Sequence, residues 1–342
     1  MNFLSDLKET FITPSKKRTY IIIGIGVFSL ILVIIIIIAA SSSSGGSKQE
    51  RTPFESYLNT KKYLYVWGYP NAENFIKFLI DHKYSKVFLY VGCVEWDLDK
   101  LIVGNFHSAG DMEAKELIKR LIEKKIEVEL CIYLNDSPNN FANVDKMPEI
   151  AKALANVQKT LKFTALHFDV EPSNNENLEA LLHMYEECRK HIKVSAILKP
   201  GWLNKKMSDL ESYFTSADYY KKFKDCETFV DAIMTVTDYT DLMAYSNTYE
   251  GVDVFLNKFQ IIKKRHDSNV AKPALELDPK ITKEGLYPRY QEDKDKFFEY
   301  FVNVSKQFDG ATIHQYEVWY NDLYCKAPKK DSSYYYGNPE EC

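Results

Sequence analysis

The sequence carries little net charge, no glycine-rich phosphate loop and no internal repeat. Its 44 basic and 48 acidic residues give a formal charge of -4, which is too small to indicate a nucleic-acid partner. The missing glycine-rich loop after the first apolar segment of strand length disfavours a doubly wound nucleotide-binding sheet. The lack of a repeat argues against a repeat array. What remains is the composition of an ordinary folded domain, with 24 tyrosines.

One long apolar run, residues 20–40, contains no charged residue. A helix of this length covers roughly 30 Å, the thickness of a bilayer core. A cleaved signal peptide is the alternative, because Ala39 and Ala40 are small, but signal h-regions are usually shorter. We therefore expect a signal-anchor of a single-pass, type II membrane protein. Four basic residues precede the run, Lys8, Lys16, Lys17 and Arg18, and two follow it, Lys48 and Arg51. Because the flank with more basic residues usually stays in the cytosol, we expect a cytosolic N-terminus and a barrel in the secretory lumen or at the cell surface.

Cysteine is absent before residue 93. All six cysteines follow the apolar run, in a compartment that would permit disulfides. Six cysteines allow 15 connectivities, and their spacing does not choose among them. Burial of Cys93 and Cys131 as apolar side chains stays an open alternative. The sequons at Asn135 and Asn303 are candidate glycan acceptors.

Composition divides the chain into segments. Residues 1–19 would form a cytosolic tail before the membrane helix, and the Ser/Gly-rich stretch at 41–60 a flexible linker. One large domain is expected at 61–325. Residues 326–342 would form a peripheral C-terminal tail. A long connection at 201–225 predicts an insertion over the top of the domain.

Within the domain, apolar segments of strand length alternate with amphipathic ones. Helical periodicity is clearest at 112–125 and 177–191. Strict alternation predicts parallel strands, and eight units in about 280 residues predict a closed (β/α)8 TIM barrel, an α/β fold. The strand segments are 63–69, 86–92, 128–134, 163–170, 193–199, 239–245, 273–277 and 310–316.

The fourth strand segment places ionisable residues at every second position. His167, Asp169 and Glu171 would therefore share one face of the strand. Barrel active sites lie at the C-terminal ends of the strands, where Tyr133 and Asn135 are also expected. Carboxylates mixed with aromatic rings suit a sugar ligand. The predicted site residues are Trp67, Tyr69, His167, Asp169, Glu171, Met243, Tyr245, Asn247, Glu276, His314, Glu317 and Trp319.

This segment resembles the fourth strand of the chitinase-type glycoside hydrolases, family eighteen, whose signature there is D-G-x-D-x-D-x-E. Asp169 and Glu171 match the last Asp and the Glu. His167, Ala165 and Thr164 stand where the family has the second Asp, the Gly and the first Asp. The match is therefore to the D-x-E end of the signature.

Two other segments extend the resemblance. Residues 242–247 are similar to the sixth-strand M-x-Y-D, with Met243 and Tyr245 matching and Ser246 at the Asp. The eighth-strand segment, which ends in Trp in the family, ends here in His314. The third-strand S-x-G-G is absent.

The resemblance implies an enzyme that hydrolyses an N-acetylhexosamine-type glycan without a cofactor. Glu171 would be the general acid, and its neighbour Asp169 would raise its pKa because like charges resist joint ionisation. The substrate's acetamido oxygen would be the nucleophile, positioned by Asp169 and Tyr245. His167 could replace the missing acids as a titrating partner.

Four alternatives stay open. The barrel could bind glycans as an inactive, lectin-like protein. A retaining glycosidase would use Glu276 as nucleophile, about 5–5.5 Å from Glu171. A metal-dependent phosphodiesterase would use His167, Asp169 and Glu171 as ligands. Finally, these three residues could form a buried polar network that holds the barrel together.

Overall fold

The computed structural model describes residues 51–134, 141–172, 174–266, 270–278, 281, 283–316 and 318–319. Several predicted features lie outside these residues: the membrane helix at 20–40, the linker up to residue 50, the tail from residue 326, and Asn135, Glu317, Cys325 and Cys342. Across the described part of the chain, no helix combines the length and the apolar composition that crossing a membrane requires.

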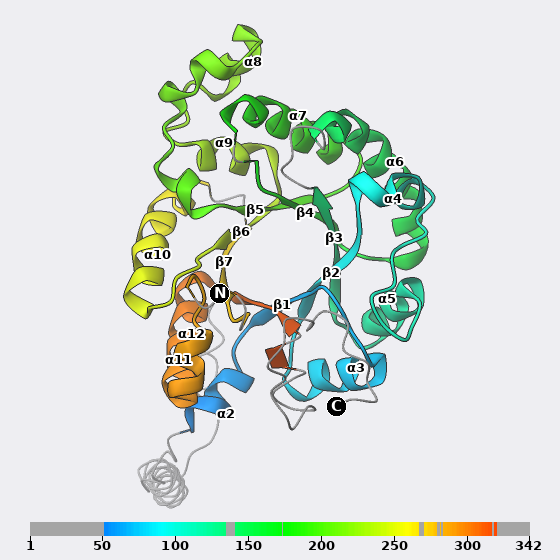
Figure 1. The fold of residues 1–342 in the computed structure, drawn as a ribbon, viewed down its shortest axis with the longest axis vertical. Coiled ribbons are helices and arrows are strands. Elements are labelled where there is room, and N and C mark those ends of the chain that lie inside the picture. The colour runs from blue at the N-terminus through cyan, green and yellow to red at the C-terminus, as the bar shows by residue number, and fades with distance from the viewer. Residues whose placement is uncertain are drawn as a thin grey trace, which may run out of the picture. The chain divides into compact units, whose positions relative to one another are not determined.

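Eight parallel strands form a closed barrel, in which each strand pairs with the next along the chain and β8 pairs with β1. Figure 1 shows the strands as an inner ring and the helices as an outer ring. The predicted TIM barrel is confirmed, and every predicted strand segment overlaps a strand. The strands are β1 Lys62–Val66, β2 Lys86–Cys93, β3 Glu127–Leu134, β4 Ala165–Val170, β5 Val194–Leu198, β6 Tyr239–Met243, β7 Val270–Glu276 and β8 Ala311–His314.

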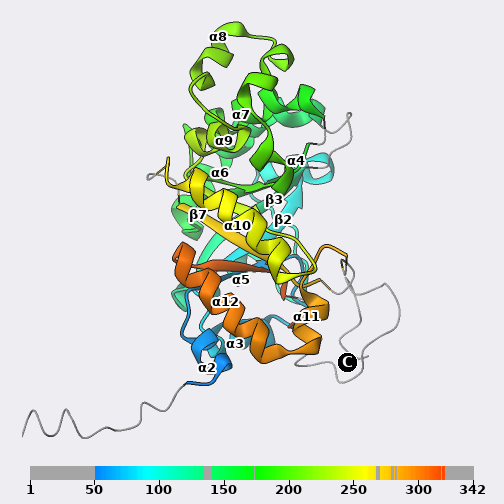
Figure 2. The same cartoon turned by 90° about the vertical axis from the view of Figure 1, so that its left-hand side faces the viewer.

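Helices connect consecutive strands and cover the outside of the barrel (Figures 1 and 2). The helix α2 Pro53–Leu58 precedes β1 and packs on α12, with the rings of Tyr57 and Phe298 4.8 Å apart. The helices that follow are α3 Ala72–Asp81, α4 Val94–Ile102, α5 Ala114–Glu123, α6 Met147–Leu161, α7 Leu178–Arg189, α8 Ala217–Tyr220, α9 Phe229–Val236, α10 Tyr249–Lys263, α11 Tyr287–Glu292 and α12 Lys294–Phe308.

The helix α5 illustrates how the sequence pattern produces these elements. Leu117, Ile118 and Leu121 recur at helical spacing and are buried, while Lys119 is exposed. The helix ends shortly before Lys125, whose φ of 63° lies in the left-handed region. The predictions for 112–125 and 177–191 are thus confirmed as α5 and α7, with slightly shorter ends.

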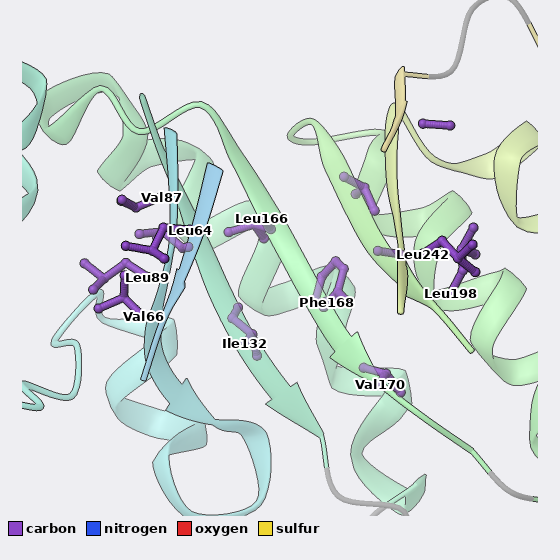
Figure 3. Close-up of a cluster of buried hydrophobic side chains, with 14 of the residues drawn as sticks. Leu64, Val66, Val87, Leu89, Ile132, Leu166, Phe168, Val170, Leu198 and Leu242 are labelled. Carbon is purple, nitrogen blue, oxygen red and sulfur yellow. The ribbon is translucent and has the colours of Figure 1, made fainter. Parts of the chain in front are cut away.

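Side chains on each strand alternate between two layers. On β4, Leu166, Phe168 and Val170 belong to the apolar layer between strands and helices, which Figure 3 shows in close-up. His167 and Asp169 alternate with them and point into the barrel. Truncating the fully buried Phe168 to alanine should cost about 3–5 kcal/mol of folding free energy.

The long connection at 201–225 packs on α7 rather than over the top of the barrel. The Glu179 carboxylate of α7 accepts a hydrogen bond from the Thr215 backbone N–H at 2.7 Å, and Lys222 pairs with Glu186 at 3.0 Å. These contacts hold the segment on the outer side of the helical ring, where α8 lies in Figures 1 and 2. Its short 3-10 helices are η3 Pro200–Asn204, η4 Met207–Asp209, η5 Glu211–Tyr213 and η6 Lys221–Phe223.

The cysteines among the described residues are free thiols. Cys93, Cys131 and Cys188 are buried and Cys226 is half-buried. Cys131 belongs to the apolar cluster inside the barrel. For Cys93 and Cys131 the structure therefore favours apolar packing over a disulfide.

Candidate active site

A cavity of about 390 Å³ opens at the C-terminal ends of the strands. This is the end of a TIM barrel at which active sites lie. The lining side chains stand on or just after every strand except β2. They are Tyr65, Trp67, Tyr133, Asp169, Glu171, Ile197, Met243, Tyr245, Glu276, Ile281 and His314.

Most of the predicted site residues meet in this cavity. Alternation along β4 explains why Asp169 and Glu171 line it together. Glu276 and His314 come from neighbouring strands, where they are direct register partners. The predicted residues that line the cavity are Trp67, Asp169, Glu171, Met243, Tyr245, Glu276 and His314.

Tyr69 lies outside the cavity, so its prediction as a binding residue is corrected. The strand β1 ends at Val66, and the alternation used to place Tyr69 does not continue past that point. Its ring is fully buried against Phe75, and its hydroxyl donates to the backbone carbonyl of Met112 at 3.1 Å. Tyr69 is therefore a core residue.

Two further predicted residues also lie elsewhere. Trp319 is buried in an aromatic cluster behind the strands, where its ring stacks on Phe298. Asn247 is exposed beyond β6, and its carbonyl accepts from the Arg289 side chain at 3.2 Å. Both follow a strand end, but neither side chain is among the residues that line the cavity.

His167 lies beneath the cavity, in a fully buried polar network. Its Nε2 is hydrogen-bonded to the Tyr65 hydroxyl at 2.7 Å, and its Nδ1 to the Ser195 hydroxyl at 2.8 Å. Ser195 also donates to Glu129, which pairs with Lys86. Burial, together with the Lys86 charge, lowers the pKa of His167 to about 3. His167 is therefore neutral near pH 7, which corrects its prediction as a titrating partner or substrate contact.

Asp169 has a different environment, although it shares a strand face with His167. Its side chain is 8% exposed, and it has no hydrogen-bond partner among the residues that the structure describes. Burial raises the pKa of Asp169 to about 7, and repulsion from Glu171 adds to this rise. The fold therefore favours the protonated form of Asp169 up to about neutral pH.

Glu171 stands at the rim of the cavity and is about one-third exposed. The Lys199 ammonium lies 3.8 Å from its Oε2 and donates to its backbone carbonyl at 3.2 Å. The carboxyl group thus stands between a buried acid and a cation. Solvent and a ligand can both reach it.

On the opposite wall, His314 links two cavity residues. The Trp67 indole N–H donates to His314 Nε2 at 2.7 Å, and His314 Nδ1 is 2.7 Å from Glu276 Oε2. An indole N–H can only donate, so Nε2 must accept and Nδ1 carries the proton. A neutral His314 therefore satisfies both neighbours, and its ring lies 5.9 Å from that of Tyr245.

Sequence reasoning missed Tyr65, Ile197 and Ile281 as lining residues. Tyr65 has the same strand parity as Trp67, so alternation could have identified it. Ile281 lies in the connection after β7, where no periodic pattern exists.

The predicted set of metal ligands does not form. Both nitrogens of His167 are hydrogen-bonded inside the barrel, and only Asp169 and Glu171 face the cavity. Within the described ranges, no three His, Cys, Asp or Glu side chains are grouped so that they could hold a metal ion.

No protein-family model matches the sequence, and no curated protein matches it. Solved structures with a similar fold include a chitinase from Chromobacterium violaceum ATCC 12472 (12% identity, TM-score 0.43, covering 64% of this chain and 68% of that one). A second is a GH18 chitinase from Pseudoalteromonas aurantia (14% identity, TM-score 0.49, covering 75% of this chain and 94% of that one). A third is the spore cortex-lytic enzyme SleL of Bacillus megaterium QM B1551 (12% identity, TM-score 0.47, covering 75% of this chain and 70% of that one). At these identities the likeness is one of fold alone.

Proposed function

We propose that the barrel is a glycoside hydrolase acting on a glycan that contains N-acetylhexosamine. The observation that carries this proposal is that a buried Asp169, whose pKa is raised, and a solvent-accessible Glu171 line one cavity at the strand ends. Such a pair can hold a proton at neutral pH and release it to a leaving group.

In the proposed reaction Glu171 gives its proton to the glycosidic oxygen as the bond to the anomeric carbon breaks. The acetamido oxygen of the same sugar attacks that carbon and forms a bicyclic intermediate. Asp169 accepts the amide N–H and supports the positive charge that develops, while the Tyr245 hydroxyl donates to the acetamido oxygen. Water, deprotonated by the Glu171 carboxylate, then opens the intermediate with net retention of configuration.

The other wall residues suit a sugar ring. Trp67 and Tyr133 lie with their ring centroids 6.3 Å apart and are partly exposed to the cavity. Their faces can stack against the C–H faces of a pyranose, and Met243 adds an adaptable apolar contact. Burial of Tyr245 raises its pKa well above the ordinary value, so its hydroxyl stays a donor across the physiological range.

The test is the Glu171→Gln variant with 4-nitrophenyl N,N′-diacetylchitobioside. Loss of the acid should lower kcat by about 10²–10⁴-fold and leave ligand binding nearly unchanged. Glu176→Gln is the matched control, because Glu176 is an exposed acid in the same connection after β4. Unchanged turnover in Glu171→Gln would remove the catalytic assignment.

A lectin-like barrel is the second candidate, and two observations favour it. The Lys199 ammonium beside Glu171 stabilises the ionised carboxylate, which cannot donate a proton. The position below Asp169 holds a neutral His167 rather than an acid. Saturable binding of chitin oligosaccharides by the wild-type protein, without hydrolysis of any chromogenic glycoside, would establish this candidate instead.

We further propose that residues 20–40 anchor the protein in a membrane, with the barrel on the lumenal or extracellular side. The support is the uncharged apolar run and the excess of basic residues before it. In a protease-protection experiment on the full chain in sealed vesicles, the barrel should be protected. Digestion of the barrel in intact vesicles would contradict the orientation.

A further inference from the structure

We infer that the face of the barrel opposite the cavity docks on the anionic headgroups of the bilayer that residues 20–40 are proposed to enter. This inference rests on the membrane anchor proposed above and adds an orientation to it. It follows from the charge of the turns on this face, from the backbone conformation of three lysines in those turns, and from the place where the chain enters the barrel.

Basic residues gather in the segments that join a helix to the following strand. These turns lie at the N-terminal ends of the parallel strands, opposite the cavity, and in Figure 2 this end of the barrel is on the left. By sequence they contain nine lysines and arginines against three aspartates, although acids outnumber bases in the whole chain. We call this the basic face. Its segments are 59–61, 82–85, 124–126, 162–164, 190–193, 237–238, 264–269 and 309–310.

Five lysines of the basic face carry charges that the described residues do not neutralise. Within the described ranges their ammonium groups form no ion pair or hydrogen bond, and all five are exposed. Other basic residues here have partners: Lys61 pairs with Asp309 at 2.9 Å, Lys190 and Arg265 pair with nearby acids, and Lys83 donates to a neutral amide. The five lysines without such a partner are Lys124, Lys125, Lys162, Lys193 and Lys264.

Helix stability alone does not explain these lysines. A cation in the last turn of a helix stabilises the helix dipole, but Lys193 lies four residues past the end of α7. Lys83, Lys125 and Lys162 have φ values of 56°, 63° and 63°, in the left-handed region that favours glycine or asparagine. A lysine is conformationally less favourable than glycine at these positions, so we attribute its presence to the charge of the face.

The chain enters the barrel at this same face. The strand β1 starts at Lys62, and the preceding helix α2 ends at Leu58. Asn59, which follows α2, accepts a hydrogen bond from Lys83 of the turn between α3 and β2 at 2.7 Å. Because α2 has six residues, it is only about 9 Å long, and its first residue, Pro53, stays close to this turn. The connection toward residues 20–40 therefore starts near the basic face.

The length of this connection makes the bilayer the surface that the basic face meets. Residues 41–52 separate the apolar run from α2, and twelve residues span at most about 40 Å. A Ser/Gly-rich chain of this length averages about 20 Å from end to end. Each lysine that reaches an anionic membrane surface raises the affinity about fivefold. Docking by this face directs the cavity, at the other end of the barrel, away from the bilayer.

The test measures acetylation of individual lysines by mass spectrometry, with the full chain reconstituted in vesicles. Vesicles of POPC are compared with vesicles that contain about 30% anionic POPG, and sulfosuccinimidyl acetate labels the amines outside them. At about 50 mM NaCl, POPG should slow acetylation of the unpaired turn lysines at least about threefold, and about 500 mM NaCl should remove the difference. The lysines to compare are Lys124, Lys125, Lys162 and Lys193.

Two lysines on the same helices provide the internal control. Lys115 lies about 14 Å before Lys124 along α5, and Lys152 lies on α6 before Lys162; both are exposed. Their acetylation should change little between the two kinds of vesicle. Equal acetylation of the turn lysines in both kinds of vesicle, or equal slowing at Lys115 and Lys152, would overturn the inference.

Variants assign the slowing to the basic face. The test variant combines Lys124→Gln, Lys125→Gln and Lys162→Gln. The control variant removes three charges from exposed positions on the same two helices and combines Lys115→Gln, Lys119→Gln and Lys152→Gln. The test variant should lose at least about half of the slowing at Lys193, whereas the control variant should keep it. Melting temperatures near that of wild type would show that both variants fold, and equal slowing in both would contradict the assignment.

Flotation of the same samples separates the inference from the anchor. Flotation with both kinds of vesicle, without slower acetylation of the turn lysines in POPG, would retain the anchor and overturn the inference. Flotation with POPG vesicles alone, together with slower acetylation, would retain the docking face and remove the anchor. Slower acetylation in soluble polygalacturonate, but not with POPG vesicles, would make an acidic glycan the partner and overturn the inference.

Discussion

The interior of the barrel contains two polar regions that differ in how their hydrogen bonds are satisfied. In the lower region, Glu129 bridges Lys86 and Ser195, and Ser195 bonds to His167. In the upper region, Asp169 has no hydrogen-bond partner among the described residues. The same face of β4 contributes a side chain to each region, His167 to the lower one and Asp169 to the upper one. A satisfied network stabilises a fold, whereas an acid with a raised pKa that faces a cavity can act on a bound ligand.

The largest expected effect on stability is in the lower region. Glu129→Ala would leave the Lys86 ammonium without its main partner, while Lys86 is largely buried. Removing one member of a buried ion pair typically costs about 3–5 kcal/mol of unfolding free energy. Urea unfolding followed by circular dichroism measures this loss. A loss below about 1 kcal/mol would contradict the role given to the network.

In contrast to Glu129→Ala, the Asp169→Asn variant should have a higher free energy of unfolding than wild type, together with low activity. The pKa of Asp169 is raised in the folded protein from 3.8 to about 7, so the fold favours its protonated form. Its ionisation therefore costs stability progressively as the pH rises from about 4 to about 7. The asparagine variant lacks this cost and should gain about 2–4 kcal/mol over wild type near pH 8, and little near pH 4. Unfolding titrations at both pH values measure the difference, and an equal gain at both would contradict the assignment.

Trp67→Phe should change the protonation of His314 with a smaller effect on stability. The variant removes the indole N–H that donates to Nε2, so Nε2 can bind a proton, and Glu276 on the Nδ1 side of the ring would stabilise the imidazolium. Loss of one hydrogen bond costs about 1 kcal/mol. ¹⁵N NMR of the imidazole should show an Nδ1–H tautomer in wild type and a larger imidazolium fraction in the variant at about pH 6. His314→Gln identifies the signal among the seven histidines.

Chelation with EDTA should have the smallest effect, because both His167 nitrogens are bonded inside the barrel and this histidine does not face the acids. Neither activity nor the melting temperature is expected to change. A drop in either one that zinc or magnesium restores would reopen the phosphodiesterase alternative.

The sequence was sufficient for the barrel and for much of the cavity. Strand alternation along β4 placed Asp169 and Glu171 correctly, because the parity of a strand is a local property. Strand alternation gave a wrong position for Tyr69, because this residue lies past the end of β1, where side chains no longer alternate. It also placed His167 on the correct face, but it could not show at which depth of the barrel the cavity ends.

The contact between Trp67, His314 and Glu276 could not be predicted. Glu276 and His314 meet because β7 and β8 pair with these two residues in register, and Trp67 joins them only when β8 closes against β1. Register between strands depends on the packing of the whole ring rather than on a local pattern. The partner of a buried side chain is therefore harder to predict than the face on which it lies.

The most direct test of the central claim uses two substrates that differ only in the group on carbon 2. These are 4-nitrophenyl N,N′-diacetylchitobioside and 4-nitrophenyl cellobioside, which has hydroxyl groups in place of the acetamido groups. If Asp169 and Tyr245 position an acetamido nucleophile for Glu171, the first substrate is cleaved with retention of configuration, as followed by NMR of the initial product, and the second is not cleaved. Cleavage of both at similar rates, or inversion of configuration, would contradict the account.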